Sequence, residues 1–272
     1  MSFRVVTDSC CDMLRGIIKV PLTIRVGDHT FTDNEKLDQS DLLWAMKNCP
    51  EAPKTACPSP TQYMEAYGDG TDDVYVVTLS ALLSGSHNVA QQGATLWLEE
   101  HPEGHIRVFN SCSASAGEAL IALKIKEIAS TDLPFEEVVS QIDKFCGEMN
   151  TLFVLESLDN LRKNGRLSAL QSIVTSTLKI KLLMGATPEG EICKKSQALS
   201  IKQALSKMTA IMAADEKHAG KILSISHCNC LERAFLLREM AQKQCHFSQT
   251  VIFDTCGIST VYANDGGIVA AY

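Results

Sequence analysis

The amino-acid sequence predicts an α/β protein with two domains, each built on a mostly parallel sheet flanked by helices. Short runs of β-branched residues alternate along the chain with longer amphipathic stretches. This alternation is typical of strands joined by right-handed crossover helices. The chain has 272 residues, of which 45% are hydrophobic, so it can form a large core, and a disordered chain is excluded.

Buried strands are expected where short apolar runs such as FRVVT and VYVVTL occur. These runs are bounded by polar residues and are too short to form helices. The expected strands cover residues 3–7, 74–79, 105–109, 152–155, 222–226 and 250–253.

Helices are expected in the amphipathic stretches between these strands. Ser59 and Pro60 supply an N-cap and a proline at the first helical position, and Pro134 begins another helix in the same way. The expected helices cover residues 41–47, 87–100, 117–128, 135–149, 167–178, 202–215 and 231–243.

A domain boundary is expected near residue 150, after a long helix and before the run LFVL. The two predicted domains are therefore residues 1–150 and residues 151–272. No flexible linker separates them, so the two halves should pack closely and leave a cleft between them.

Composition excludes several classes of partner and location. Twenty-five basic against 32 acidic residues give a net charge of −7, which disfavours nucleic acid. No apolar stretch reaches the length of a membrane span, and the first residues do not resemble a secretory signal. The chain is therefore expected to be cytoplasmic, with its eleven scattered cysteines reduced.

The sequence contains one local cluster of residue types that can bind a metal ion. Its members, all in the second half, are His227, Cys228, Cys230, Cys245 and His246. The cluster lacks the CxxC pairs that let two thiolates hold one zinc ion. Neither a metal nor any other cofactor is therefore expected.

Hydroxyl side chains gather after three predicted strands, at Ser9, in residues 80–88 and in residues 110–117, while Thr55 precedes the Ser59 cap. The carboxyl ends of parallel strands share one edge of a sheet, which is where ligands usually bind. Hydroxyls beside glycines and helix N-termini suit a single carboxylate or phosphate. Any one of these segments is better explained by caps and turn formers, whereas three segments converging on one edge favour a ligand site.

A hydrolase with a Ser-His-Asp triad is the enzymatic alternative, drawn from Ser84, Ser86, His87 and Asp8. No G-x-S-x-G elbow is present, and a serine so close in sequence to its base need not face it. Nucleotide-binding glycine motifs are also absent from the sequence.

Six ordered segments carry a family resemblance: VTDS (6–9), VPLT (20–23) followed by FTD (31–33), KTACPSP (54–60), LSGS (83–86), NSCSAS (110–115) and LRKNGRLS (161–168). Together they resemble the DegV family of bacterial fatty-acid-binding proteins. The resemblance covers most of the chain. Any one motif is weak, whereas the ordered set is specific.

The resemblance implies a non-enzymatic carrier that holds one long-chain fatty acid, with the carboxylate between the domains and the tail in an apolar tunnel of the second domain. The residues matched to the carboxylate contacts are Thr55 and Ser84. In the best understood branch, the bound acid is presented to a fatty acid kinase. Candidate tunnel walls are the apolar positions of residues 152–155 and 167–184.

The sequence departs from the family pattern near the expected head group. Ala56 follows Thr55 where the family has a second hydroxyl, Tyr262 takes the place of a histidine, and residues 196–200 lack an arginine. Arg166 is the remaining candidate cation, with a structural role at the Gly165 turn as the alternative.

Further candidates for the ligand site are Ser9, Gly85, Ser86, Ser111, Ser113, Arg166 and Tyr262. The alternative function is a small-molecule enzyme acting on a carbonyl or phosphate compound with His87 and Ser84 in the cleft. A third alternative is a degenerate relative retained as an interaction module.

Overall fold

The computed structural model describes residues 2–13, 15–167 and 180–272. Its strands are β1 (Phe3–Asp8), β2 (Ile18–Val20), β3 (Thr23–Val26), β4 (His29–Thr32), β5 (Lys54–Ala56), β6 (Asp73–Thr78), β7 (Ile106–Asn110), β8 (Thr151–Val154), β9 (Lys181–Ala186), β10 (Ile192–Ala198), β11 (Ile222–His227), β12 (Gln249–Asp254) and β13 (Ile268–Ala271). Its helices are α1 (Gln39–Asn48), α2 (Pro60–Tyr67), α3 (Ser86–Glu100), α4 (Ala116–Ala129), α5 (Phe135–Glu148), α6 (Asp159–Lys163), α8 (Ile201–Ala214), α9 (Leu231–Gln244) and α10 (Gly257–Ala263).

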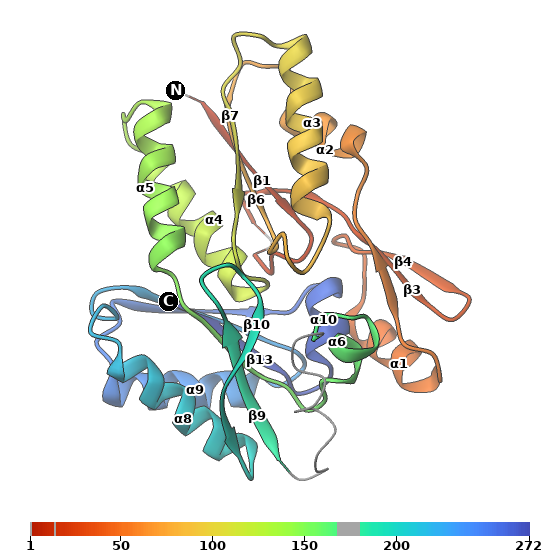
Figure 1. Ribbon diagram of the computed structural model, residues 1–272, viewed down its shortest axis with the longest axis vertical. Coiled ribbons are helices and arrows are strands. Elements are labelled where there is room, and N and C mark those ends of the chain that lie inside the picture. Colours follow the sequence, from red (N-terminus) through yellow and green to blue (C-terminus); the bar gives the residue numbers. More distant parts are fainter. Residues whose placement is uncertain (1, 14, 168–179) are drawn as a thin grey trace.

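The first half is a parallel sheet with helices on both faces, seen in the upper part of Figure 1. Its order is β2-β1-β6-β7, and every neighbouring pair is parallel. Successive residues of β1 point to opposite faces: Val6 packs with α2 and α3, and Val5 packs with α4 and α5. The prediction of a parallel sheet with helices on both faces is confirmed here.

The second half is also an α/β layer, but its sheet is mostly antiparallel, which corrects the sequence prediction. The order is β10-β9-β8-β13-β11-β12, and only β11 and β12 run parallel. The tight turn between β9 and β10 reverses the chain, and the final strand, β13, enters between β8 and β11. Strands β9, β10 and β13 were not expected from the sequence, and these three strands supply the antiparallel pairs.

The two faces of the second sheet pack against different parts of the protein. Leu152 and Val154 of β8 pack with α8 and α9 in one core, on the lower left of Figure 1. Alternate residues of a strand point to opposite faces, so Thr151 and Phe153 face the first half. Helix α4 packs against β11 and β13 on this side as well as against the first sheet. The space between the two sheets is therefore bounded by both halves.

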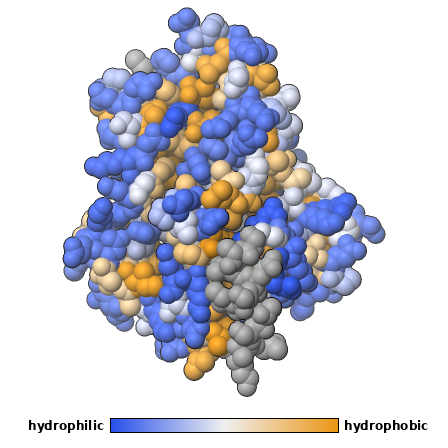
Figure 2. Space-filling model, in the orientation of Figure 1, coloured by the Kyte–Doolittle hydropathy of each residue, from blue (hydrophilic) through white to orange (hydrophobic). Residues whose placement is uncertain are grey.

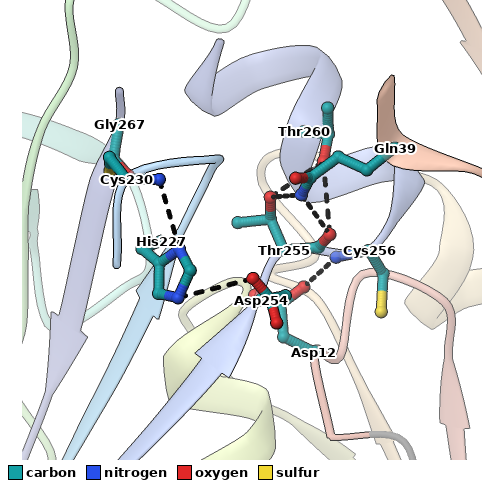
Figure 3. A network of polar contacts seen from close by, with 9 residues as sticks. All are labelled: Asp12, Gln39, His227, Cys230, Asp254, Thr255, Cys256, Thr260 and Gly267. Carbon is teal, nitrogen blue, oxygen red and sulfur yellow. Dashed lines mark hydrogen bonds and ion pairs between the residues drawn. The ribbon is translucent and has the colours of Figure 1, made fainter. Parts of the chain in front are cut away.

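A small antiparallel sheet, β4-β3-β5, and helix α1 flank this space and carry Thr55. Residues of the first half also hold the start of α10. Asp12 accepts a hydrogen bond from the Cys256 amide, and Gln39 donates to Thr255 and Thr260 (Figure 3). Helix α10 belongs by sequence to the second half, but the first half fixes its position.

The helix starts predicted at Ser59 and Pro134 are confirmed, and Ser59 makes a complete capping box with Gln62. The helix expected at residues 167–178 lies almost wholly outside the described residues. Within the described ranges, no helix is long and apolar enough to cross a bilayer. The division at residue 150 stays a prediction, although the first sheet ends at Asn110 and the second begins at Thr151.

Candidate functional site

An apolar cavity lies between the two halves, on the face of the second sheet that α8 and α9 leave uncovered. Apolar side chains make most of its wall: Leu79, Leu83, Ala114, Phe153, Leu155, Leu161, Ala186, Ile192, Ile258, Ala263 and Val269. Its volume within the described part of the chain is about 100 Å³. Figure 2 shows hydrophobic residues reaching the surface where the two halves meet.

The cavity adjoins an open polar recess on the surface. Leu83 and Arg166 line both, and the recess is also lined by Ser84 and His87. A ligand that spans both spaces would pass from an apolar environment to a polar one beside Ser84. The arrangement suits an amphipathic molecule with one small polar end.

Thr55 lines neither the cavity nor the recess and is linked to the cavity through Tyr262. The hydroxyl oxygens of Thr55 on β5 and Tyr262 on α10 are 3.0 Å apart and hydrogen bonded. The side chain of Tyr262 lines the cavity. Two hydroxyl groups from opposite ends of the sequence therefore form a pair that can donate to a bound oxygen.

Ser84 lies in a tight loop just before α3. The carbonyl of Ser80 accepts hydrogen bonds from the amides of Leu83 and Ser84. Ser84 Oγ accepts one from the Ser86 amide, at 3.2 Å, so its own hydroxyl proton can be donated to a ligand. A Cβ placed on Gly85 would lie 3.7 Å from Sγ of Cys57, which puts this loop beside the segment that follows Thr55.

Arg166 contacts backbone carbonyls and no acidic side chain among the described residues. Its Nε donates to the carbonyl of Leu83 at 3.2 Å, and one terminal nitrogen donates to the carbonyl of Asn164. This is the structural role that the sequence left as an alternative. Arg166 nevertheless lines both the cavity and the recess, so its positive charge lies near the junction of the two spaces while its Nε holds the Ser84 loop.

The remaining candidate serines make hydrogen bonds inside the protein. Ser9 Oγ accepts from the Leu22 amide, and Ser111 Oγ donates to the Ser113 carbonyl. Ser86 is fully buried, bonded to Asp8 at 2.8 Å and to Tyr63 at 2.6 Å. Ser113 lines the cavity, but its hydroxyl is 2.6 Å from that of Thr151. These hydrogen bonds give all four hydroxyl groups a structural role in packing or in turns.

The hydrogen bonds do not assemble the Ser-His-Asp triad weighed from the sequence. His87 Nδ1 is bonded to Thr78 Oγ1 at 3.0 Å, whereas Asp8 accepts from Cys10, Leu79 and Ser86. Burial, with a contribution from the positive charge of Arg107, lowers the pKa of His87. The imidazole is therefore neutral at pH 7 and is not oriented by Asp8.

Three of the five residues considered as a metal site, His227, Cys230 and Cys245, have other side-chain partners. His227 accepts from the Cys230 amide and its other nitrogen lies 3.4 Å from Asp254 (Figure 3). Cys230 Sγ donates to the Gly267 carbonyl and Cys245 Sγ to that of Thr209. All eleven cysteines are free thiols.

Another group of ligand types stands out among the described residues: Asp8, Cys10 and Glu118, all buried, with ligand atoms within 4.8 Å of one another. Neither carboxyl oxygen of Glu118 has a hydrogen-bond donor. Burial, then the negative charge of Asp8, raises the pKa of Glu118 well above its ordinary value. Burial therefore favours the protonated form of Glu118, and no metal ion is needed to balance its charge.

Several cavity residues were not singled out from the sequence, notably Ile192, Ile258 and Val269. One signal was available for β8, because alternation along a strand places Phe153 and Leu155 on one face and Leu152 and Val154 on the other. No comparable signal exists for α10 or for the β9–β10 turn, whose positions depend on contacts with the first half.

Known proteins share this architecture over its whole length. A DegV-domain-containing protein from Streptococcus gordonii is 35% identical over 100% of this chain and 99% of its own. A DegV-family crystal structure from Ruminococcus gnavus, refined with vaccenic acid, has a TM-score of 0.96 and 46% identity over 100% of both chains. The Fak B3 protein of the Streptococcus pneumoniae fatty acid kinase, loaded with linoleic acid, has a TM-score of 0.92 and 32% identity over 100% of this chain and 99% of its own.

The family model described as "Uncharacterised protein, DegV family" matches residues 2–271. This match spans both sheets and the cavity between them. The chain belongs to the DegV family.

Proposed function

We propose that this protein is a non-enzymatic carrier that binds one long-chain fatty acid and presents it to a fatty acid kinase. The observation that carries the proposal is an apolar cavity that is lined by Tyr262, the partner of Thr55, and adjoins a polar recess lined by Ser84. The fatty acids in the related structures from R. gnavus and S. pneumoniae support the same ligand class. The carboxylate lies at the hydroxyls and the acyl chain lies in the cavity.

The acyl chain of the fatty acid supplies most of the binding affinity, and the carboxylate sets its orientation in the site. Burying about 14 methylene groups at roughly 0.8 kcal/mol each offers about 11 kcal/mol before the costs of association. Two or three neutral hydroxyl donors with one arginine nearby then suffice to place the carboxylate. No proton transfer is required of His87, which is hydrogen bonded to Thr78.

Two further points belong to the proposal. We place the domain division at residues 150 and 151, which separates the residues of the two sheets. We also place the protein in the cytoplasm, an interpretation supported by its eleven unpaired cysteines.

The direct test is mass spectrometry of an organic extract of the purified protein, together with native mass spectrometry of the intact complex. We expect a near-stoichiometric long-chain fatty acid. A protein that is empty and fails to take up added long-chain acids would overturn the carrier assignment.

Replacing Ser84 by alanine tests the head-group contact. We expect Ser84→Ala to weaken fatty-acid binding roughly five- to tenfold, the effect of one lost hydrogen bond of about 1 kcal/mol. Its unfolding free energy should change by no more than about 1 kcal/mol. Titration with a fluorescent fatty acid and chemical denaturation measure the two quantities.

Ser86→Ala is the matched control, because Ser86 is two residues away and bonds only inside the protein. It should lower stability without a specific loss of affinity. Equal affinity losses in the two variants would remove Ser84 from the site.

Filling the cavity tests the acyl site. Ala186 follows Met184 on the same face of β9 and lines the cavity. We expect Ala186→Phe to abolish binding of a long-chain fatty acid, while Ala214→Phe at the exposed end of α8 leaves it unchanged. Stoichiometry from native mass spectrometry distinguishes the two outcomes, and full occupancy in Ala186→Phe would place the tail elsewhere.

A further inference from the structure

The turn between β9 and β10 closes one side of the apolar cavity, which is called the acyl cavity here because the acyl chain is proposed to lie in it. Gly190 lines the cavity, as do the flanking residues Ala186, Glu191 and Ile192. Figure 1 shows this hairpin rising from the second sheet toward the ends of β6 and β7 in the first. The turn therefore spans the gap between the two halves directly over the proposed ligand.

The second sheet holds this turn weakly. Strand β10 is an edge strand that pairs only with β9, and the pairing of β9 with β8 stops at Gly185. Beyond that point the described bonds within the hairpin tip are local, such as those between Thr187 and Glu191. Such a tip can move without breaking the sheet.

One buried side chain of the first half fixes the turn in place. The hydroxyl of Ser80 donates to the carbonyl of Gly190 at 2.8 Å. The contact is close, because a Cβ on Gly190 would lie 2.4 Å from Ser80 Oγ and 2.8 Å from Cα of Cys112. Gly190 has φ of +93°, a conformation in which glycine is strongly favoured.

The same Ser80 also organises the head-group loop. Its carbonyl accepts from the amides of Leu83 and Ser84, and its amide donates to the carbonyl of Ser113. Ser80 is buried and does not line the cavity. It is therefore placed to act on the ligand only through the hairpin turn and the Ser84 loop.

The cavity enclosed by the described walls is small for a long-chain fatty acid. Pockets for small molecules usually measure about 300 to 1,000 Å³, and the described walls enclose about 100 Å³. Among the described residues, the hydrogen bond from Ser80 to Gly190 is the one that joins the hairpin tip, residues 187–191, to the first half. Displacing the tip enlarges the cavity without disturbing the α8 and α9 core.

We propose that Ser80 is a positioning residue that holds the β9–β10 turn over the acyl cavity as a lid, so that fatty-acid exchange requires the Ser80–Gly190 hydrogen bond to separate. This inference rests on the proposed function. Under it, the fatty acid enters and leaves past the β9–β10 turn, and the Ser80–Gly190 hydrogen bond limits the rate of exchange.

Stopped-flow exchange of cis-parinaric acid tests the lid. We expect Ser80→Ala to accelerate both association and dissociation roughly five- to tenfold, because one hydrogen bond no longer holds the lid closed, with a smaller change in Kd. Ser80→Thr keeps the hydroxyl and should restore the rates toward those of the wild type. Gly190→Ala should open the lid further by steric clash, relative to Gly220→Ala, which has the same sign of φ and no atom within 4 Å.

Thr209→Val is the matched control for stability, because Thr209 is a buried hydroxyl that donates to a carbonyl far from the cavity. It should lower stability and leave the exchange rates unchanged. Wild-type rates in Ser80→Ala, with stability lowered as in Thr209→Val, would overturn the lid. If the wild-type protein binds no parinaric acid and takes up no other long-chain fatty acid, the proposed function itself fails.

Discussion

Glu118→Gln is expected to stabilise this protein, increasingly so as the pH rises. Glu118 lies in α4, fully buried between the two sheets, and no donor reaches either of its carboxyl oxygens. Burial raises the pKa of its neighbour Asp8 as well, but the three hydrogen bonds that Asp8 accepts oppose that rise. Burial and the negative charge of Asp8 therefore favour the neutral form of Glu118 in the folded protein.

The direction of the pH effect follows from the raised pKa of Glu118. The folded protein holds this proton more tightly than the unfolded chain. Stability is therefore unaffected below the ordinary glutamate pKa and falls as pH rises from that value to the raised one. The loss is about 1.4 kcal/mol for each pH unit within that window. Glutamine keeps the shape and a donor toward Asp8 but has no proton to lose.

Chemical denaturation of both proteins between pH 5 and pH 8 measures this difference. Glu127→Gln, on the exposed side of the same helix, is the control and should show no increasing gain. A Glu118→Gln variant that is less stable at every pH would mean that Glu118 is ionised and paired with a cation.

Asp33→Ala is expected to destabilise the protein by about 3 kcal/mol. The buried carboxylate of Asp33 accepts hydrogen bonds from the amides of Gly257 and Ile258 at 2.7 and 2.8 Å, at the start of α10. Removing it leaves two buried donors without partners, each of which costs about 1 to 3 kcal/mol. Because α10 carries Tyr262, fatty-acid binding should weaken as well.

Asp38→Ala is the matched control, since Asp38 caps α1 by accepting from the amides of Ser40 and Asp41 at an exposed position. Loss of an exposed cap costs about 1 kcal/mol. Denaturation curves of the two variants separate burial from capping. Equal losses would show that Asp33 acts only as a helix cap and does not hold the two halves together.

Patterns within a few residues of the sequence were sufficient to predict much of the fold. The apolar runs at residues 3–7 and 222–226 became β1 and β11, and the Ser59 capping box begins α2 as its sequence indicates. The direction of strands in the second sheet could not be predicted in this way. The position of β13 between β8 and β11 depends on pairing between segments more than 100 residues apart in sequence, for which periodicity carries no information.

The candidate site, too, could be predicted from the sequence only in part. The motifs around Thr55 and Ser84 pointed to two segments, and the structure brings the Ser84 loop beside the residues that follow β5. The bond between Thr55 and Tyr262, 207 residues apart, had no signal beyond the family resemblance. The hydroxyls of Ser9, Ser86 and Ser111 were indistinguishable from ligand contacts until their internal bonds were known.

Composition, periodicity and capping thus determined the α/β class, most of the helices and strands, and the polar loops that precede the helices. These features depend on neighbours within a few residues along the chain. The tertiary structure alone decided which face of β8 lines the cavity, which hydroxyls remain available to a ligand, and that Ser80 meets Gly190. Such choices are made by long-range packing, where burial and hydrogen-bond satisfaction must be met at once.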